Sequence, residues 1–286
     1  MNYQWYPGHM TKAKRMMQEN IKLIDLIIEL VDARIPASSR NPDIDELGKN
    51  KGRIVLLNKA DLADPVYNRQ WINYFTDRGA YVLEMNSRTG EGVKKIQGLV
   101  GEACREKIER DKKRGIVNRP VRAMVAGIPN VGKSTFINSF AGKACTKTGN
   151  KPGVTKGKQW IRLNKNLELL DTPGILWPKF EDQEVGKKLA FIGSMNDEIV
   201  PMQQLACDLT ELLQKLYPQA FAERYGIKPE RKPYRILEMI AESRKCYGKG
   251  ESLDLDRACM ILTDDFRSGR LGRITLERPK EGALEE

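Results

Sequence analysis

Apolar, often β-branched runs alternate with amphipathic stretches along the chain up to residue 175. Four of these runs, LIIELVDAR, RIVLLNKAD, AYVLEMNS and VRAMVAG, predict strands, and KQWIRL with LELLDTPG predicts a further strand pair. Apolar residues at three- and four-residue steps predict helices over 10–24, 68–79 and 91–114. This repeated alternation of strand and helix predicts an α/β fold, with a parallel, doubly wound sheet covered by helices on both faces.

The C-terminal part of the chain shows a different pattern, in which helical periodicity dominates. Helices are predicted over 205–216, over YRILEMIAESRK and over 255–266, and only RITLE near the end resembles a strand. We therefore predict one domain over residues 1–178, followed over residues 179–286 by a linker and a small all-α domain.

Positive charge is concentrated in the first of these domains. The formal net charge is +11, and residues 1–178 carry 31 Lys and Arg against 18 Asp and Glu, whereas the remainder carries 18 against 20. Residues 112–165 contain 13 basic residues and no acidic residue. Such a surplus exceeds what one bound triphosphate needs and favours nucleic acid as a partner; the alternative is a solvated face that keeps the protein soluble.

Cysteine usage and hydropathy favour a cytoplasmic protein. The five cysteines are widely spaced and form no CxxC pair, which favours reduced thiols over a disulfide framework or a zinc site. The start, MNYQWYPGHM, lacks the pattern of a secretory signal, and LIIELV is too short to span a bilayer. We expect no membrane partner.

The sequence GIPNVGKS fits the phosphate-loop pattern G-x-x-x-x-G-K-[ST], with a predicted strand before it and a predicted helix after it. Its glycines would let backbone amides face the phosphates, Lys133 would reach the β- and γ-phosphates, and Ser134 would ligate Mg²⁺. A chance glycine turn is the alternative, and the flanking strand and helix argue against it. The residues expected to line the phosphates are Asn130, Val131, Gly132, Lys133, Ser134 and Thr135.

Two further motifs would complete a magnesium and γ-phosphate site. In LELLDTPG, Asp171 ends an apolar strand, where its carboxylate would hold Mg²⁺ through water. Gly174 would present a backbone amide to the γ-phosphate, because no side chain blocks the approach. Between these motifs lies KPGVT, in which Thr155 is the expected Mg²⁺ ligand of the triphosphate state.

A guanine-reading turn is predicted at NKAD. The carboxylate of Asp61 matches the two donors on the guanine edge, and a site of this kind can reject adenine by ~10⁴–10⁵-fold. Asn58 would bind the base edge and brace the loop, and the stem of Lys59 would cover the ring face. After the next strand, Asn86 and Ser87 would support the guanine carbonyl.

The motif order is unusual, because the guanine-binding NKAD turn precedes the phosphate loop in the sequence. Chain order does not decide spatial assembly, since the carboxyl ends of parallel strands face one crevice whichever strand comes first. The rearrangement makes the segment after DTPG the connection to the helical part of the chain. The loop that senses the γ-phosphate would then also tether the C-terminal domain.

This order resembles the circularly permuted GTPases with a P-loop fold, and WYPGHMTKAKR, DARIPASSRNP and the helical C-terminal part resemble the YlqF family. The resemblance runs nearly end to end. It implies a GTPase that binds GTP and GDP with Mg²⁺ and acts in late assembly of the large (50S) ribosomal subunit. The implied partners are the precursor particle, its 23S rRNA and its ribosomal proteins, and we expect a monomer.

The water-orienting residue of GTPases is missing after DTPG, because Ile175 and Leu176 occupy that stretch. The resemblance implies that His9 orients the water instead, from a flexible turn before the first helix; a structural role for this histidine is the alternative. Without a built-in Gln, hydrolysis should stay slow until the ribosomal partner orders the site, since a group supplied in trans can be worth ~10³–10⁵ in rate.

The Asn at position 130 is similar to that of potassium-dependent GTPases, which implies K⁺ as an additional cofactor. The alternative is a turn Asn bonded to its own backbone.

Contacts to rRNA are expected from residues 112–165 and from KPERKPYR. Tyr234 and Tyr247 would either stack on exposed bases or pack in the core. Two other functions remain open: a nucleotide-gated RNA-binding module in which hydrolysis matters little, and a signalling GTPase with a protein partner.

Overall fold

The computed structural model describes residues 8–116, 119–146, 159–174, 176, 182–228 and 232–279. The chain divides into two compact units. The sheet unit consists of Gln4–Lys179 and Glu277–Glu286, and the helical unit consists mainly of Phe180–Leu276. The chain therefore leaves the sheet unit after Lys179 and returns to it at Glu277, so the helical unit is joined to the sheet unit at both of its ends.

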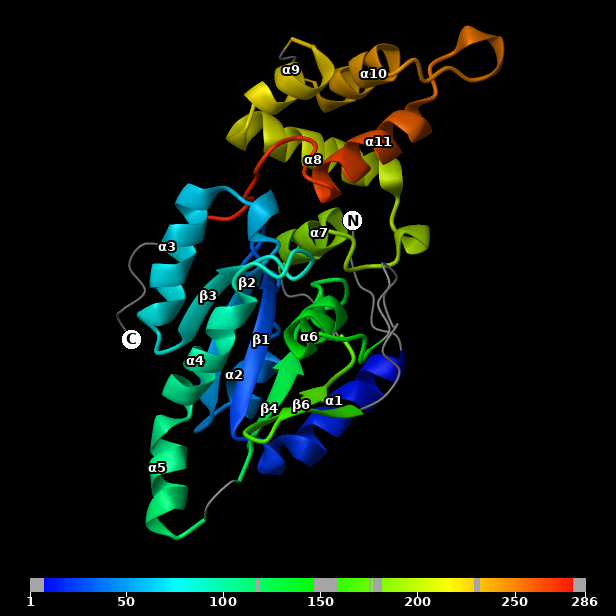
Figure 1. Ribbon diagram of the computed structural model, residues 1–286. Coiled ribbons are helices and arrows are strands. Elements are labelled where there is room, and N and C mark those ends of the chain that lie inside the picture. The colour runs from blue at the N-terminus through cyan, green and yellow to red at the C-terminus, as the bar shows by residue number, and fades with distance from the viewer. Residues whose placement is uncertain are drawn as a thin grey trace. The chain divides into compact units, whose positions relative to one another are not determined.

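A six-stranded sheet of order β3-β2-β1-β4-β6-β5 forms the centre of the sheet unit (Figure 1). Five neighbouring strands are parallel, and only the edge strand β5 runs antiparallel to β6. The predicted α/β fold is confirmed, with this one antiparallel edge. The strands are β1 (Leu26–Asp32), β2 (Gly52–Asn58), β3 (Tyr81–Met85), β4 (Val121–Ala126), β5 (Gln159–Asn164) and β6 (Leu167–Asp171).

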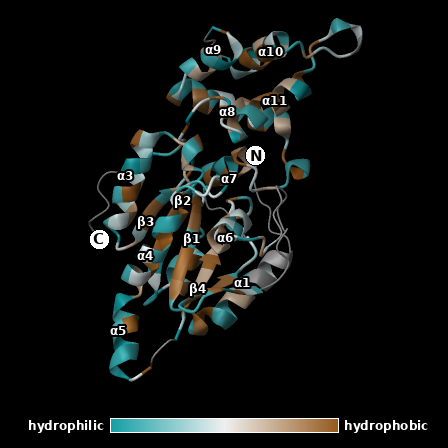
Figure 2. Ribbon diagram, viewed as in Figure 1, coloured by the Kyte–Doolittle hydropathy of each residue, from teal (hydrophilic) through white to brown (hydrophobic). Residues whose placement is uncertain are grey.

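The central strands owe their position to continuous apolar sequence. Every residue of β1 is buried, as expected for a parallel strand that helices cover on both faces. Glu29 in its middle is fully buried too, and Arg53 on β2 neutralises it at 2.7 Å. The hydropathy colouring shows brown strands among helices with teal outer residues (Figure 2).

Helices pack on both faces of the sheet. The connections through α2 and α3 run in one direction along the sheet, and those through α4 and α6 run in the other, so right-handed crossovers place the two pairs on opposite faces. Helix α3 begins in the expected way, because Asp64 caps it and Pro65 is its first residue. The helices of this unit are α1 (Gly8–Asn20), α2 (Asp43–Leu47), α3 (Pro65–Thr76), α4 (Val93–Ala103), α5 (Arg105–Lys113) and α6 (Lys133–Ala141).

Two predicted helices differ from the structure. The helix expected over 91–114 is broken at Cys104, which has φ −110° and ψ 13° and separates α4 from α5. The first helix starts at Gly8 and ends at Asn20, followed by a single 3₁₀ turn over Ile21–Leu23. His9 therefore lies in the first turn of α1, and the expectation of a flexible turn before the helix is wrong.

The helical unit contains five helices among its described residues. Its core includes a buried carboxylate, Asp265, which accepts hydrogen bonds from Arg224, Arg270 and the hydroxyl of Tyr225. The two arginines keep the pKa of Asp265 below its usual value against the effect of burial. The helices are α7 (Gln183–Phe191), α8 (Met202–Leu216), α9 (Gln219–Tyr225), α10 (Pro233–Ser243) and α11 (Leu255–Arg267).

The RITLE segment does not form a strand. Ile274 and Leu276 are buried, but the segment pairs with no strand of the described residues. Glu277 instead docks on the loop after β1, where its carboxylate accepts hydrogen bonds from the amides of Ala37 (2.7 Å) and Ser38 (3.1 Å) and from the Ser38 hydroxyl. Its carbonyl accepts a bond of 3.3 Å from the indole of Trp71. Within the described residues, no helix is long and apolar enough to cross a membrane.

Candidate functional site

The predicted motifs meet at one edge of the sheet. Strands β2, β3, β4 and β6 are parallel, and each ends at or just before a predicted motif: NKAD, NSR, the phosphate loop and DTPG. Because carboxyl ends of parallel strands open on the same crevice, the rearranged chain order still produces one site.

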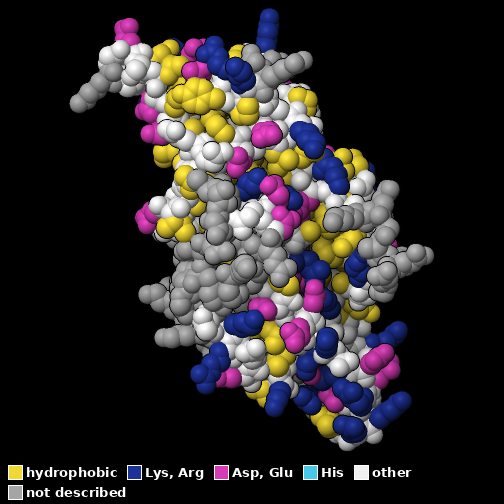
Figure 3. Space-filling model, turned by 180° about the vertical axis from the view of Figure 1, so that it is seen from behind, with side chains coloured by type: hydrophobic (Ala, Val, Ile, Leu, Met, Phe, Trp, Pro, Cys, Tyr) yellow, Lys and Arg dark blue, Asp and Glu magenta, His cyan; other side chains and the backbone are white. Residues whose placement is uncertain are grey.

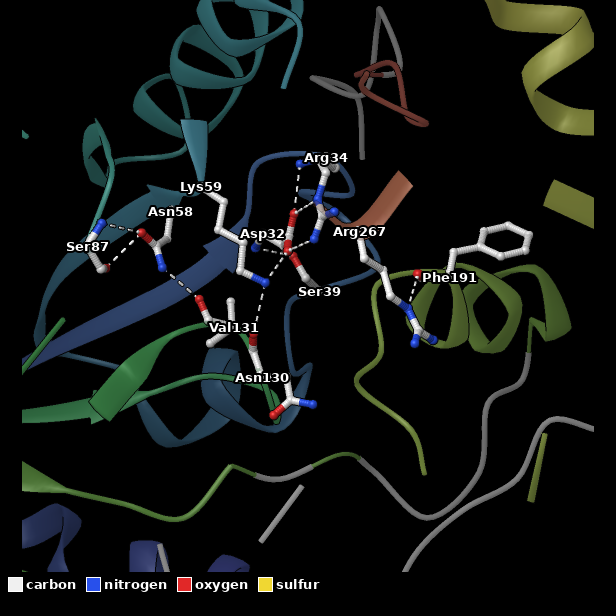
Figure 4. Close-up of polar contacts among 10 residues, drawn as sticks. All are labelled: Asp32, Arg34, Ser39, Asn58, Lys59, Ser87, Asn130, Val131, Phe191 and Arg267. Carbon is white, nitrogen blue, oxygen red and sulfur yellow. Dashed lines mark hydrogen bonds and ion pairs between the residues drawn. The ribbon is translucent and has the colours of Figure 1, made fainter. Parts of the chain in front are cut away.

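Asn58 joins three of these motifs (Figure 4). Its Nδ2 donates to the carbonyl of Val131 in the phosphate loop at 2.7 Å. Its Oδ1 accepts from the amide of Ser87 at 3.0 Å and from the Ser87 hydroxyl at 2.7 Å. All of these atoms are buried, so each bond fixes one loop against another. Asn58 thus connects the loops, and its side-chain amide is bonded to protein atoms.

Lys59 is held in a strained backbone conformation that points its side chain at the phosphate loop. Its φ of 58° lies in the left-handed region, which is uncommon for a residue with a side chain. Its Nζ donates to the carbonyl of Asn130 at 2.9 Å and pairs with Asp32 at 3.0 Å (Figure 4). Burial lowers the pKa of Lys59, while Asp32 opposes that shift.

Asp32 and Arg34 form a buried ion pair that sequence reasoning missed. Arg34 donates through Nε and Nη2 to the two oxygens of Asp32, each at 2.8 Å. Burial opposes ionisation, but Arg34 and Lys59 together keep the pKa of Asp32 well below its ordinary value. The signal was an Asp at the end of a buried strand, directly beside the strand that ends in NKAD.

The phosphate loop adopts the curled backbone that its glycines predict. Gly127 has φ 153° and Gly132 has φ 101°, and a Cβ at Gly132 would overlap Nδ2 of Asn58. Helix α6 starts immediately after Gly132. Lys133 turns back over the loop and donates to the carbonyls of Gly127 (3.0 Å) and Ile128 (2.8 Å). Ser134 and Thr135 follow in the first turn of α6, both partly exposed.

Asp171 is the strongest indication of a bound cation. Its side chain is buried, and neither carboxylate oxygen has a side-chain or backbone hydrogen-bond partner of normal geometry among the described residues. Burial raises its pKa to about 6, with Lys133 and the Thr172 amide acting in the opposite direction. Burial likewise lowers the pKa of Lys133 to about 8. An orphaned buried carboxylate beside the phosphate loop fits the oxygen ligands that Mg²⁺ prefers, directly or through water.

Gly174 lies against the phosphate loop so closely that no other residue fits. A Cβ on this residue would come within 2.7 Å of Nζ of Lys133 and 2.8 Å of the backbone of Pro129. The DTPG turn and the phosphate loop are therefore in direct contact. Leu176, two residues further on, is buried and apolar and cannot hold a water molecule.

The remaining predicted residues occupy different situations. Asp61 lies in the short turn Ala60–Leu62, is partly exposed, and has no hydrogen bond to another described residue. Asn86 is buried, and its side-chain oxygen accepts from the amides of Arg88 and Thr89, so it shapes the turn after β3. The backbone of His9 is part of α1, and Thr155 lies outside the described residues.

Comparison with known proteins agrees with this geometry. Residues 122–237 match a family model described as 50S ribosome-binding GTPase. A Bacillus cereus protein, "Ribosome biogenesis GTPase A", is 46% identical over 98% of this chain and 95% of its own length. A Thermotoga maritima protein of the same name is 32% identical over 97% and 95%. The crystal structure of GNP-bound YlqF from T. maritima is similar with a TM-score of 0.67 at 29% identity, covering 94% of this chain and 99% of that one.

Proposed function

This chain belongs to the ribosome biogenesis GTPase A (YlqF) family and is a GTPase, and from that premise we propose that it binds the precursor of the large ribosomal subunit through rRNA and promotes its late maturation. GTP hydrolysis is stimulated by the particle and releases the protein. The main support for nucleotide binding at this site is that four motifs converge on one edge of the sheet, where Asn58 of the NKAD turn is hydrogen-bonded to two of the others.

The guanine base would lie against the NKAD turn. Asp61 is suited to read the base, because its carboxylate is accessible and has no other hydrogen-bond partner among the described residues. Lys59 would cover the ring while its ammonium stays on the phosphate loop, and the backbone near Ser87 would support the guanine carbonyl. Asn58, in contrast, acts on the base indirectly by holding the loops together.

The phosphates would be held by the amides of residues 130–135 and by Lys133, with Gly174 as the contact to the γ-phosphate. Mg²⁺ neutralises charge on the phosphate oxygens when it is bound. Ser134, Asp171 and Thr155 would hold it, and the unpaired oxygens of Asp171 are the main support for this assignment. K⁺ is a further proposed cofactor, with Asn130 as a ligand; turnover that is equal in Na⁺ and K⁺ would contradict it.

The attacking water would be positioned by His9. The support is that the usual position for a water-orienting side chain is filled by Leu176, which is buried and apolar, so another residue has to supply this role. His9→Ala should lower turnover and leave the affinity for GTP unchanged. An unaltered turnover number in this variant would show that the histidine is structural.

Contacts to rRNA would come from the basic surface of the sheet unit and from the basic, tyrosine-containing segment of the helical unit. Helix α5 carries Arg110, Lys112 and Lys113 in its last turn. On the face drawn in Figure 3, Lys and Arg side chains are numerous over the lower part of the sheet unit. Tyr234 and Tyr247 are each 51% exposed, so neither packs in the core, and stacking on bases is open to both.

The decisive experiment is single-turnover GTP hydrolysis with no particle and with 30S, mature 50S and immature 50S particles in turn. We expect acceleration on the order of 10³-fold or more by large-subunit particles alone, since a missing group supplied in trans is worth that much. Binding to the particle should weaken steeply with salt, because contacts to phosphate release counterions. Equal rates with and without particles would leave only an RNA-binding module, and salt-insensitive binding would indicate a protein partner.

A further inference from the structure

A hollow on the sheet unit lies beside the edge strand β5, away from the nucleotide motifs. Its volume is about 240 Å³, and it is lined by Leu23, Arg122, Trp160, Arg162 and Glu168. This volume is below the ~300–1,000 Å³ of sites that enclose a whole small-molecule ligand. The hollow is therefore suited to one part of a larger ligand rather than to a whole ligand.

The register of the sheet builds the polar side of this hollow. Arg122 on β4 pairs with Glu168 on β6, and Glu168 pairs in turn with Arg162 on β5. Directly paired residues point to the same face of a sheet, so the three side chains form a row across three strands. Glu168 holds Arg122 at 3.2 Å, whereas Arg162 is exposed and has no partner among the described residues.

The apolar side of the hollow is an aromatic ring that the fold leaves accessible. Trp160 lies two residues before Arg162 and therefore on the same face of β5, and 38% of it is exposed. The guanidinium carbon of Arg122 lies 5.5 Å from the centre of its ring, a cation–π distance. Arg122 is itself held by Glu168, so the ring is oriented by a fixed neighbour while much of its surface stays free.

We propose that this hollow binds one unpaired base of an RNA strand, with the base stacked on Trp160 and an adjacent phosphate on Arg162. The proposal rests on the rRNA-binding function proposed above and names a contact point for it. An exposed aromatic ring beside an unpaired arginine is the combination that single-stranded RNA sites use, since every base has a face to stack and every nucleotide a phosphate.

Charge favours RNA over a protein segment as the occupant. The only carboxylate in the lining is already paired with Arg122, so the hollow is left with a net positive charge from Arg162. The strand also belongs to the stretch 112–165, which contains no acidic residue. A polyanionic chain passing over this surface meets no repulsion from that stretch.

The arginine and glutamate side of the hollow lies at the end of the sheet opposite to the nucleotide motifs. Arg122 and Glu168 are the second residues of β4 and β6, whereas the phosphate loop and DTPG follow the opposite ends of these strands. Arg162 pairs with Glu168 at that far end, whereas Trp160 pairs with Leu170, one residue before Asp171. GDP affinity is therefore measured for every variant, as the check both on folding and on the nucleotide site.

The test compares Trp160→Ala with Tyr81→Ala, in the full-length protein. Tyr81 is a matched control because it is also 38% exposed and lies on β3, at the other edge of the same sheet. The probes are a fluorescein-labelled oligoadenylate of 12 nucleotides and, as a charge-only competitor, inorganic polyphosphate. Immature 50S particles provide the third probe.

We expect Trp160→Ala to weaken oligoadenylate binding by about 5- to 150-fold, the range measured for removal of a stacking ring. The affinity of Tyr81→Ala for oligoadenylate and the competition by polyphosphate should both remain at the wild-type level. Trp160→Phe should restore most of the affinity for oligoadenylate. Arg162→Ala should lower the slope of log K against log salt by about one.

Each outcome separates this proposal from the function on which it rests. If the wild-type protein binds neither RNA nor particles, the proposed function fails and this inference fails with it. If it binds both and Trp160→Ala binds equally well, only the hollow is wrongly assigned. If Trp160→Ala loses particles but keeps oligoadenylate, a ribosomal protein occupies the hollow and the RNA assignment is overturned.

Discussion

Replacing Asp171 by Asn should make the nucleotide-free protein more stable while weakening its response to Mg²⁺. The carboxylate is buried, and neither oxygen has a hydrogen-bond partner among the residues that the structure describes, so without a bound metal ion its charge is held at a cost to the fold. Burial raises its pKa from 3.8 to about 6. At 1.36 kcal/mol for each pKa unit, ionised Asp171 lowers the stability of the empty protein by about 3 kcal/mol at neutral pH.

The gain from substitution is smaller than this figure for two reasons. A buried Asn amide without partners still costs about 1–3 kcal/mol. Lys133 also loses a nearby negative charge, although it keeps its bonds to two loop carbonyls. We therefore expect a net gain of up to about 2 kcal/mol, which corresponds to a rise in Tm of up to about 6 °C at this chain length.

The sign of the pH dependence follows from the direction of the pKa shift. Below pH 3.8 the carboxyl of Asp171 is protonated in both the folded and the unfolded protein, and the fold bears no cost from a buried charge. As the pH rises through about 6, the buried carboxyl ionises and this stability is lost. Asp171→Asn carries no ionisable group at this position and therefore does not lose stability over this pH range. The difference in Tm should thus be small near pH 4, grow between pH 4 and 6, and level off above pH 7.

The assay is thermal unfolding of both proteins in EDTA without nucleotide, then with GTP and Mg²⁺. Wild type should overtake Asp171→Asn in the second condition, because wild type keeps the carboxylate and gains more binding energy from the metal. Asp77→Asn removes a charge from an exposed position and should shift neither Tm. A lower Tm for Asp171→Asn in EDTA at pH 7.5 would refute the reasoning, since it would mean that the carboxylate has partners in the empty protein.

Three further predictions concern close contacts. Gly132→Ala should weaken GDP binding by more than about 100-fold in fluorescent-nucleotide titration, because its Cβ meets Asn58 at a positive φ; Gly142→Ala, at φ 65° in open space, should keep wild-type affinity. Asn58→Ala removes three hydrogen bonds and should lower the free energy of unfolding by about 2–4 kcal/mol in urea, with a loss below 1 kcal/mol speaking against buried bonds. Glu277→Gln should cost about 1–2 kcal/mol and speed amide exchange at Ser38; unchanged exchange would show that the carboxylate does not hold the loop.

The parts of the fold that sequence could predict are those encoded locally. Each strand is an apolar run that ends in its own motif, and each motif carries the glycines or polar residues that its turn needs. Asn58 illustrates the limit: its loop-bracing role was predictable from its place after a strand, whereas its bonds to Val131 and Ser87 depend on strand order, which no local pattern states. In the Asp32–Arg34–Lys59 cluster, the contact of Lys59 with Asp32 likewise depends on β1 and β2 being neighbours, whereas Arg34 is only two residues from Asp32 and was overlooked.

Local pattern also misled where tertiary contacts decide. The helical periodicity of 91–114 runs through Cys104 without interruption, yet the helix breaks there. Alternation in RITLE predicts a strand, but Ile274 and Leu276 are buried without a strand partner and Glu277 caps a loop 239 residues away in sequence. Hydrophobic periodicity indicates which residues are buried, but it does not indicate which elements pack against them.

The return of the chain at Glu277 limits how this protein can be dissected. Deleting everything after Lys179 would remove the helices and, with them, the carboxylate that secures the loop behind β1 and the carbonyl that receives the Trp71 indole. Such a truncated enzyme would lose activity for reasons unrelated to the missing helices. A deletion that tests the helices alone has to be internal. A short linker should replace the segment between Lys179 and Glu277, so that Glu277 keeps its contacts with the loop after β1 and with Trp71.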